Sequence, residues 1–596
     1  MSHIQSHHGG TEEAHNTFLV ILKVHGDAIQ LWPKDKMQRI IGKTHSFRIT
    51  CHNVETHSDH PSSDIQVFVI TDPEPMLDGC KFQRQHSHGE PIAPNDLAIF
   101  MTGPVSSSRK ATYAIDVAIC KFNASNEDLS NTTTNNHTNN NTNNSNLHNT
   151  NDDNDNYELV GAAYLYLDPK FSSQGIQRTP IISKHNHTPI GQMQVDYLIV
   201  TNPVGFGQVS PKPDWLTKRN KLDAGHRGAG SGRRMDLPDE LLENTIDSFN
   251  YAHRHGADMC ELDILVTADG VPVVYHDFDV DAVAAQQSSD ELGKFRVQVN
   301  QFTVKQLRDF RLLALHDGEG CPYTLNIPNQ AESNRPFPTL AEVLDGVDET
   351  CGLNIEVKWP QLLESGKMEA KRFREINDFV DRIISVVEKH ARNRRIVLES
   401  FDADLTTMLR LKQNKFPVIF LSQGMTDRYE RYVDIRARGI WNGIYFAQAF
   451  DLAGIDIILD YYMKLGKKLV DFIHHHNLVA RAWGDLDWSQ GHVRTHSLMD
   501  DEENDDEENM QSRTSADTLE YLKGLGVQCI TYDRIDQIKS ATKTPEPMLP
   551  SKTTTQAPSI ISHNKLISTS PDNCEKQQQP PPPNPTSSMA VVCGFY

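Results

Sequence analysis

Two carboxylates, two histidines and an arginine lie close together in the middle of this sequence. Glu261 and Asp263 are two positions apart in a run typical of a β-strand, so their side chains leave the same face of it. They are a pair of oxygen ligands on a rigid element. His226, Arg227 and His276 add a proton donor, a proton acceptor and a clamp for an anion. This stretch therefore predicts acid–base chemistry on an anionic group.

The same stretch and the sequence that follows it resemble the glycerophosphodiester phosphodiesterases. The resemblance runs from about Leu222 to Gln537 and rests on motifs in the family's order: His226-Arg227-Gly228, Glu243-Asn244-Thr245, Glu261-x-Asp263, Asp269-Gly270, His276-Asp277, Glu356-x-Lys358, Glu399-Ser400-Phe401 and Trp483. Segments such as VPVVYHD, NIEVKW and TYDRID are similar to those of the large intracellular eukaryotic members that act on glycerophosphocholine.

The resemblance implies a metal site made of Glu261, Asp263 and Glu356. All three offer hard oxygen ligands, so the expected metal is Mg²⁺ or Ca²⁺ rather than zinc. The choice between the two ions depends on cavity size, which a sequence does not give. A simple ion pair between Glu356 and Lys358 is the alternative reading of that motif.

The resemblance also assigns proton transfer to His226 and His276, with the general base and the general acid left undecided. It implies that a neighbouring glycerol hydroxyl attacks the phosphorus and gives a cyclic phosphate, which water opens later. A structural role, in which the imidazole only accepts or donates a hydrogen bond, is the alternative for either histidine. The two histidines together with three carboxylates in the family's order favour catalysis.

Four further residues are candidates for binding or support. Arg227 and Lys358 would balance the phosphate charge, the first with a bidentate fork and the second as a point charge. Glu243 would orient Arg227 or approach the metal. Trp483 is either barrel packing or an aromatic face that holds the choline ammonium through a cation–π contact.

The elements that must position these residues alternate between strand and helix patterns. The expected strands are LDAGHR, CELDI, LNIEV, RIVLES, PVIFLS, GIYFAQ, VARAW and QCITYD, with helical patterns such as FREINDFVDRIISVVEKHA and ADLTTMLRLKQN between them. Eight such repeats predict an α/β fold, the (β/α)8 barrel, with its active site at the carboxyl ends of the strands. Every candidate catalytic residue lies at such an end.

The N-terminal part has a different pattern. Short alternating runs, including FLVILKV and QMQVDYLIVT, predict an antiparallel β-sandwich, either a supporting domain packed on the enzyme or a module that binds lipid or a partner. The expected order begins with a disordered tail at 1–14 and the sandwich at 15–203, which contains an Asn-rich disordered loop at 123–156. A linker at 204–220 leads to the catalytic domain at 221–540, with a capping insertion at 279–337 and an acidic loop at 498–514. A disordered tail at 541–596 follows. The proline run in the last segment could bind an SH3-type or WW-type partner.

Composition excludes several other classes of protein. A formal net charge of -21 argues against nucleic-acid binding, which needs a basic face. No apolar run reaches about 18 residues and the first twenty residues lack the pattern of a signal peptide, so we expect a cytoplasmic protein without a transmembrane segment. Nine cysteines without close pairs are expected to be reduced thiols.

The sequence therefore predicts a metal-dependent hydrolase that converts glycerophosphocholine to sn-glycerol 3-phosphate and choline. One alternative keeps the chemistry and changes the substrate to another glycerophosphodiester or a lysophospholipid. The other is a catalytically inactive relative that only binds or regulates, which would have no need of five intact catalytic residues. Headgroup preference and oligomeric state leave no mark in the sequence.

Overall fold

The structure is a computed structural model of the whole chain. It describes residues 17–542 except for 33–46, 55–64, 72–80, 87–88, 107–110, 121–156, 169, 171, 219–220, 238–239, 284–293, 310–311, 314–324, 326–329, 373, 427 and 488–512. The predicted N-terminal tail, the Asn-rich loop and nearly all of the C-terminal tail and of the acidic loop lie outside these residues; residues 541–542, predicted as tail, belong to the last helix. The described residues belong to one compact unit that extends from Met1 to Lys543.

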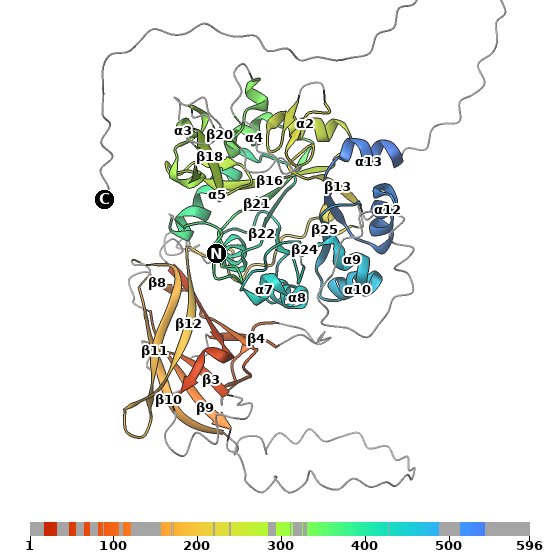
Figure 1. Cartoon of the computed structure of the whole chain (residues 1–596). Helices are drawn as coiled ribbons and strands as arrows, with labels where there is room; N and C mark the ends of the chain where they lie inside the picture. The colour runs from red at the N-terminus through yellow and green to blue at the C-terminus, as the bar shows by residue number, and fades with distance from the viewer. Residues whose placement is uncertain are drawn as a thin grey trace, which may run out of the picture. The chain divides into compact units, whose positions relative to one another are not determined.

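The N-terminal strands are all antiparallel, as predicted, and join into one curled sheet of twelve strands (Figure 1). They are β1 (Thr17–His25), β2 (Ile29–Leu31), β3 (Phe47–Asn53), β4 (Gln66–Ile70), β5 (Gln83–Arg84), β6 (Glu90–Ile92), β7 (Leu97–Met101), β8 (Val105–Ser106), β9 (Ala111–Cys120), β10 (Tyr157–Leu167), β11 (Gln174–Ser183) and β12 (Pro189–Thr201). We call this part the sheet domain. The sequence predicted a sandwich of two sheets, whereas the strands form one curled sheet.

The position of strand β1 between two cores explains why its sequence is apolar on both faces. Phe18, Val20 and Leu22 point into the core of the sheet domain itself. Leu19 and Ile21, which alternate with them, belong to the hydrophobic core of the barrel. A strand buried on both faces reads as a continuous apolar run, and FLVIL is such a run. The sheet domain therefore has a core of its own and also contributes residues to the core of the barrel.

The C-terminal part is a closed barrel of eight parallel strands, as predicted. Its strands follow the order of the sequence and close where the first pairs with both the last and the second: β13 (Leu222–Gly225), β16 (Met259–Val266), β21 (Gly352–Val357), β22 (Ile396–Ser400), β23 (Val418–Ser422), β24 (Gly454–Ile458), β25 (Val479–Trp483) and β26 (Cys529–Tyr532). Figure 1 shows these strands inside a ring of helices. A hairpin that turns at Gly270 adds the antiparallel strand β17 (Pro272–Val274).

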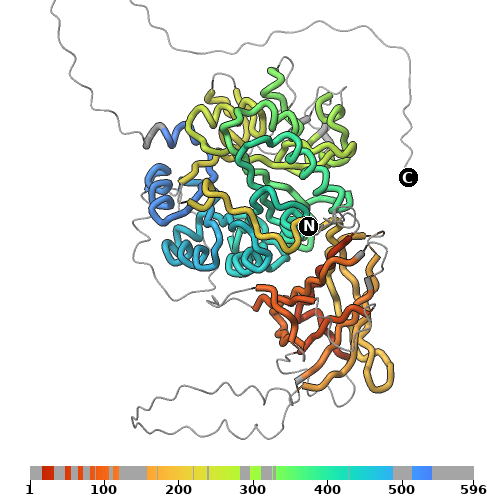
Figure 2. The backbone as a smooth tube through the Cα atoms, turned by 180° about the vertical axis from the view of Figure 1, so that it is seen from behind, coloured from red at the N-terminus to blue at the C-terminus, as the bar shows by residue number. Residues whose placement is uncertain are grey.

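Helices alternate with the barrel strands in chain order, as the yellow-to-blue tube of Figure 2 shows from behind. They are α2 (Ile246–Arg254), α4 (Leu340–Gly346), α5 (Ile376–His390), α6 (Ala403–Lys412), α7 (Ile435–Arg438), α8 (Ile440–Ala449), α9 (Leu459–Leu465), α10 (Lys467–His475), α12 (Ser515–Leu525) and α13 (Ile535–Thr542). Helix α5 buries Ile376, Val380, Ile383 and Val387, which recur at helical spacing along one face. The predicted linker contains the short helix α1 (Asp214–Thr217).

The prediction of a sixth strand at GIYFAQ, residues 443–448, is wrong. These residues form most of α8, and the sixth strand is β24, GIDII. Helix α8 is buried on nearly all sides, so its sequence has no polar stripe to reveal a helical period. A short apolar run of this kind does not distinguish a strand from a buried helix.

The insertion after the second barrel strand has its own small structure. It contains a three-stranded sheet of β18 (Asp279–Val283), β19 (Lys294–Gln298) and β20 (Leu312–Leu313), and the helix α3 (Val304–Asp309). Its Val280 and Leu307 share a hydrophobic cluster with Val273 and Tyr275 of the β17 hairpin. The insertion thus packs on the hairpin that leads to His276. No helix among the described residues is both long and apolar enough to cross a membrane.

Candidate active site

Three carboxylates converge at the carboxyl ends of the second and third barrel strands. Glu261 and Asp263 lie on β16, and Glu356 lies opposite Asp263 in the register of β21. Their ligand oxygens all lie within 4.8 Å of one another. The i, i+2 spacing on β16 and the parallel register with β21 together produce this cluster, which brings together the three metal ligands predicted from the sequence.

The electrostatics of the cluster fit a divalent cation. Among the described residues no donor reaches Glu261 Oε1, which is buried. Burial, together with the charges of Asp263 and Glu356, raises the pKa of Glu261 well above its ordinary value. Burial alone would also raise the pKa of Asp263, but His276, Lys358 and Arg227 lower it. One carboxylate oxygen without a donor and three mutually repelling charges are what a hard cation would satisfy.

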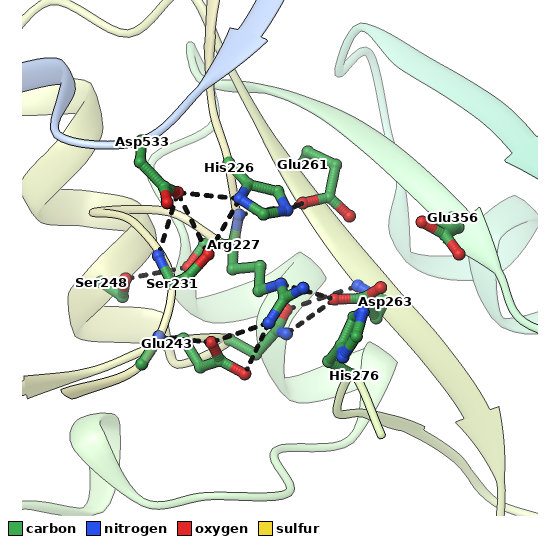
Figure 3. Close-up of polar contacts among 12 residues, drawn as sticks. His226, Arg227, Ser231, Glu243, Ser248, Glu261, Asp263, His276, Glu356 and Asp533 are labelled. Carbon is green, nitrogen blue, oxygen red and sulfur yellow. Dashed lines mark hydrogen bonds and ion pairs between the residues drawn. The ribbon is translucent and has the colours of Figure 1, made fainter. Parts of the chain in front are cut away.

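His226 directly follows β13, the first barrel strand, and its ring is held by a residue that follows β26, the last barrel strand. Its Nδ1 lies 2.8 Å from Asp533 Oδ1, and Ser231 Oγ lies 3.1 Å from the same nitrogen (Figure 3). Its Nε2 lies 4.0 Å from Glu261 Oε2. With Nδ1 committed to Asp533, Nε2 is the nitrogen that faces the carboxylate cluster.

His276 follows β17 and has a carboxylate partner of its own. Its Nδ1 lies 2.7 Å from Asp277 Oδ1. Figure 3 places the ring beside Asp263. Each histidine is therefore oriented through Nδ1 by an aspartate, the arrangement that leaves Nε2 for proton transfer.

Arg227 crosses the site between two acidic groups. Its Nη1 donates to Glu243 Oε2 at 3.0 Å, and its Nε lies 3.7 Å from Asp263 Oδ2. Its backbone N–H donates to Glu261 Oε2 at 2.9 Å. The structure therefore favours the prediction that Glu243 orients Arg227. The next residue, Gly228, has φ 87°, and a Cβ there would lie 2.5 Å from Ser248 Oγ, so the turn that aims Arg227 needs a glycine.

Lys358 continues β21 beyond Glu356, and its ammonium contacts the carboxylate cluster. Its Nζ lies 3.2 Å from Glu356 Oε1 and 3.5 Å from Asp263 Oδ1. Burial would lower the pKa of Lys358, but these two carboxylates raise it, so the side chain stays charged. Arg227 and Lys358 thus present two permanent cations beside the three carboxylates.

Trp483 ends β25 and belongs to an aromatic group at the carboxyl end of the barrel. Its ring centroid lies 5.4 Å from that of Phe401 and 5.9 Å from that of Tyr429. Its Nε1 donates to Ser422 O at 3.3 Å. The ring packs against the barrel core and is partly exposed, so both roles expected of Trp483 stay open.

The sequence interpretation assigned no role to three residues that the structure brings into the site. Asp533 and Asp277 pair with the histidines, and Asn244 Nδ2 donates to Asp263 Oδ2 at 2.9 Å. Burial would raise the pKa of Asp533, but His226 and Arg227 lower it, so it stays ionised. Asp533 directly follows the last barrel strand, and that position was the available signal.

Comparison with known proteins places these residues in a family. The sequence profile described as "Glycerophosphoryl diester phosphodiesterase family" matches residues 226–537. The glycerophosphocholine phosphodiesterase GPCPD1 of Homo sapiens is 32% identical over 371 residues, which cover 61% of this chain and 51% of that protein. The protein of the same name from Rattus norvegicus is 33% identical over 374 residues, with the same two coverages.

A solved structure, that of an Oleispira antarctica phosphodiesterase in complex with the product sn-glycerol-3-phosphate, aligns at 15% identity with a TM-score of 0.34 and covers 55% of this chain and 98% of that one. This chain spans about half the length of the mammalian relatives. The family profile, in contrast, covers just over half of the 596 residues and includes every site residue described above. The chain therefore belongs to the glycerophosphoryl diester phosphodiesterase family.

Proposed function

We propose that this chain is a metal-dependent phosphodiesterase that hydrolyses glycerophosphocholine to sn-glycerol 3-phosphate and choline. The observation that carries the proposal is the convergence of three carboxylates, two aspartate-paired histidines and two cations at one end of the barrel. Cleavage of a phosphodiester needs stabilisation of charge on the phosphoryl oxygens, a base for the nucleophile and an acid for the leaving oxygen. The choline headgroup is supported by the names of the two mammalian relatives.

Glu261, Asp263 and Glu356 would hold the metal, which we propose to be Mg²⁺ or Ca²⁺ because the ligands are all carboxylate oxygens. When bound, such a cation supplies Lewis-acid stabilisation of the phosphoryl charge. Arg227 and Lys358 would bind the non-bridging phosphate oxygens, since they are charged side chains directly beside the carboxylate cluster. Glu243 would keep Arg227 in place.

The two histidines divide the proton transfers. The Nε2 atom of one accepts the proton of the attacking hydroxyl, and the Nε2 atom of the other donates a proton to the leaving oxygen. Asp533 and Asp277 keep Nδ1 of each ring occupied, so that the same nitrogen always faces the substrate. Trp483 would contact the choline ammonium through its half-exposed ring.

The test is release of choline from glycerophosphocholine by the purified chain with Mg²⁺, with Ca²⁺ and with chelator. We expect metal-dependent release that His226→Ala reduces by about 10³-fold, within the range measured for the loss of a general acid or base. His255→Ala is the matched control, because His255 is exposed at the end of α2, where its Nδ1 donates to Tyr251 O.

A panel of glycerophosphoinositol, glycerophosphoethanolamine and a lysophospholipid separates the two parts of the proposal. Cleavage of another substrate in preference to glycerophosphocholine contradicts the headgroup and leaves the chemistry intact. No cleavage of any of them by folded, metal-supplied protein contradicts the enzymatic function and favours a binding role.

A further inference from the structure

Gln174, the first residue of β11, connects the sheet domain to the barrel through both ends of its amide. Its Oε1 accepts a hydrogen bond from Arg372 Nη1 at 3.0 Å, and its Nε2 donates to Asp404 Oδ2 at 3.0 Å. Asp404 lies on α6 and also accepts from Lys23 Nζ of β1 at 2.6 Å. The amide therefore has a fixed orientation, with its oxygen directed to Arg372.

Arg372 in turn holds the two residues that follow Lys358. Its Nε and Nη2 donate to Pro360 O at 2.9 and 2.5 Å, and its guanidinium lies 5.2 Å from the centroid of the Trp359 ring. Its nearest carboxylate, Asp402, is 3.9 Å away. The guanidinium thus joins Gln174 of the sheet domain to the backbone just beyond Lys358.

The residues that Arg372 holds also line a cavity. A cavity of about 360 Å³ is lined by Lys358, Trp359, Pro360 and Arg372, and by Phe278 on the insertion side. The hydrogen bonds of Arg372 act on the same residues.

We propose that the sheet domain positions a substrate-binding group of the active site: Gln174, through Arg372, fixes Trp359 and Pro360 and thereby places Lys358 Nζ beside the carboxylate cluster. This inference rests on the proposed function, in which Lys358 binds the phosphate. Gln174 and Arg372 are positioning residues, since neither contacts the cluster. A displacement of about 1 Å in a group that binds a reacting phosphate can reduce the rate about 100-fold.

Deletion of the sheet domain is not a usable test. Leu19, Ile21, Leu198 and Val200 of that domain lie in the same hydrophobic core as the barrel helices, so a truncated chain would expose part of that core. Point variants in the full chain are therefore required. Gln192→Ala is the matched control, because Gln192 is an exposed glutamine of the sheet domain whose Nε2 donates to Gln30 Oε1 at 2.8 Å and does not reach the barrel.

The experiment measures kcat and KM for glycerophosphocholine and, by calorimetry, the affinity for sn-glycerol 3-phosphate in the full chain. We expect kcat/KM to fall about 5-fold in Gln174→Ala and about 30-fold in Arg372→Ala, which lies within the range for misplaced binding groups. The double variant should match Arg372→Ala, because residues that act in series are not additive. Arg372→Lys, which keeps the charge but loses the fork, should fall between wild type and Arg372→Ala.

Two results would overturn the inference. One is a Gln174→Ala variant that equals Gln192→Ala in both kcat/KM and affinity for sn-glycerol 3-phosphate. The other is a double variant whose effect is the product of the single effects. Thermal unfolding of each variant separates positioning from loss of fold. If the wild type cleaves no glycerophosphodiester, the proposed function fails, while the affinity for sn-glycerol 3-phosphate still decides whether Gln174 acts through Arg372.

Discussion

Two buried clusters of charge in this molecule resemble each other in composition and differ in how their carboxylates are satisfied. At the barrel mouth, Glu261, Asp263 and Glu356 face one another, and no described donor reaches Glu261 Oε1. Between the sheet domain and α6, both oxygens of Asp404 accept hydrogen bonds from Lys23, and Arg436 Nη2 donates to Oδ1 at 2.9 Å.

The pKa of the central carboxyl moves in opposite directions in the two clusters. Burial would raise the pKa of Asp404, but Lys23 and Arg436 lower it below its ordinary value. The pKa of Glu261 is raised, because burial and its acidic neighbours act in the same direction. The protein thus supplies the counter-charge for Asp404 from two cations, whereas the carboxylates beside Glu261 could hold a metal ion. Buried charge alone does not identify a functional site, but a carboxyl whose pKa is shifted by converging acidic neighbours is a candidate for one.

The first way to sharpen this comparison is to remove one charge from the acidic cluster. Glu261→Gln should reduce kcat/KM by at least about 10³-fold, since a metal clamp supplies several kcal/mol of transition-state stabilisation. The metal-free variant should unfold at the same temperature as the metal-free wild type or higher, because one of three repelling carboxylates is gone. Initial rates with Mg²⁺ or Ca²⁺ check the first statement, and thermal melts in chelator check the second. A metal-free variant that melts much lower would mean that Glu261 has a structural role.

The matching change in the other cluster is Asp404→Asn. It leaves Lys23 and Arg436 buried with less counter-charge, so the free energy of unfolding should fall by about 3 kcal/mol. Activity per folded molecule should change no more than in Gln174→Ala. The control is Asp116→Asn, which removes a partly exposed pair with His52 and should cost less than about 1 kcal/mol. Equal losses in urea denaturation of the two variants would contradict the comparison.

A smaller effect is expected from the aspartate that orients His226. Asp533→Asn should lower kcat about 30-fold with little change in stability, because partners of this kind fix the tautomer and orientation of a ring and are worth roughly 10- to 100-fold. Ser231→Ala, which removes the weaker contact to the same Nδ1, should have a smaller effect. Steady-state kinetics beside thermal melts decide the matter; an Asp533→Asn enzyme as active as wild type would show that the pair is not used in catalysis.

The smallest expected effect is the pH dependence of the stability that Asp404 contributes. The groups that surround Asp404 are Lys23, Arg436, Gln174, Asp434, Asp196 and Asp402. Because the folded pKa of Asp404 is lowered, its contribution to stability is full above the unfolded value, 3.8, and is lost as the pH falls toward the folded value. The difference in unfolding free energy between wild type and Asp404→Asn should thus be constant near neutral pH and shrink below about 3.8. A difference that grows on acidification would contradict the lowered pKa of Asp404 in the folded protein.

Much of the barrel and its site could be predicted because the deciding patterns are local. The i, i+2 spacing of Glu261 and Asp263, the turn at Gly270 and the strand-end positions of His226 and His276 each depend on a few neighbouring residues. The sixth strand was misplaced because α8 is buried on nearly all sides and its local pattern is ambiguous.

Other features depended on which distant segments meet. Asp533 reaches His226 across 307 positions only because the barrel closes β26 onto β13. Gln174 meets Arg372 only because the sheet domain packs on the barrel helices. The sequence by itself thus determined the family and the residue types of the site, through motifs in the family's order, and the places of these residues at strand ends, through local periodicity. The tertiary structure alone decided that Asp533 pairs with His226 and that Gln174 meets Arg372, because closure and packing join residues that no local pattern connects.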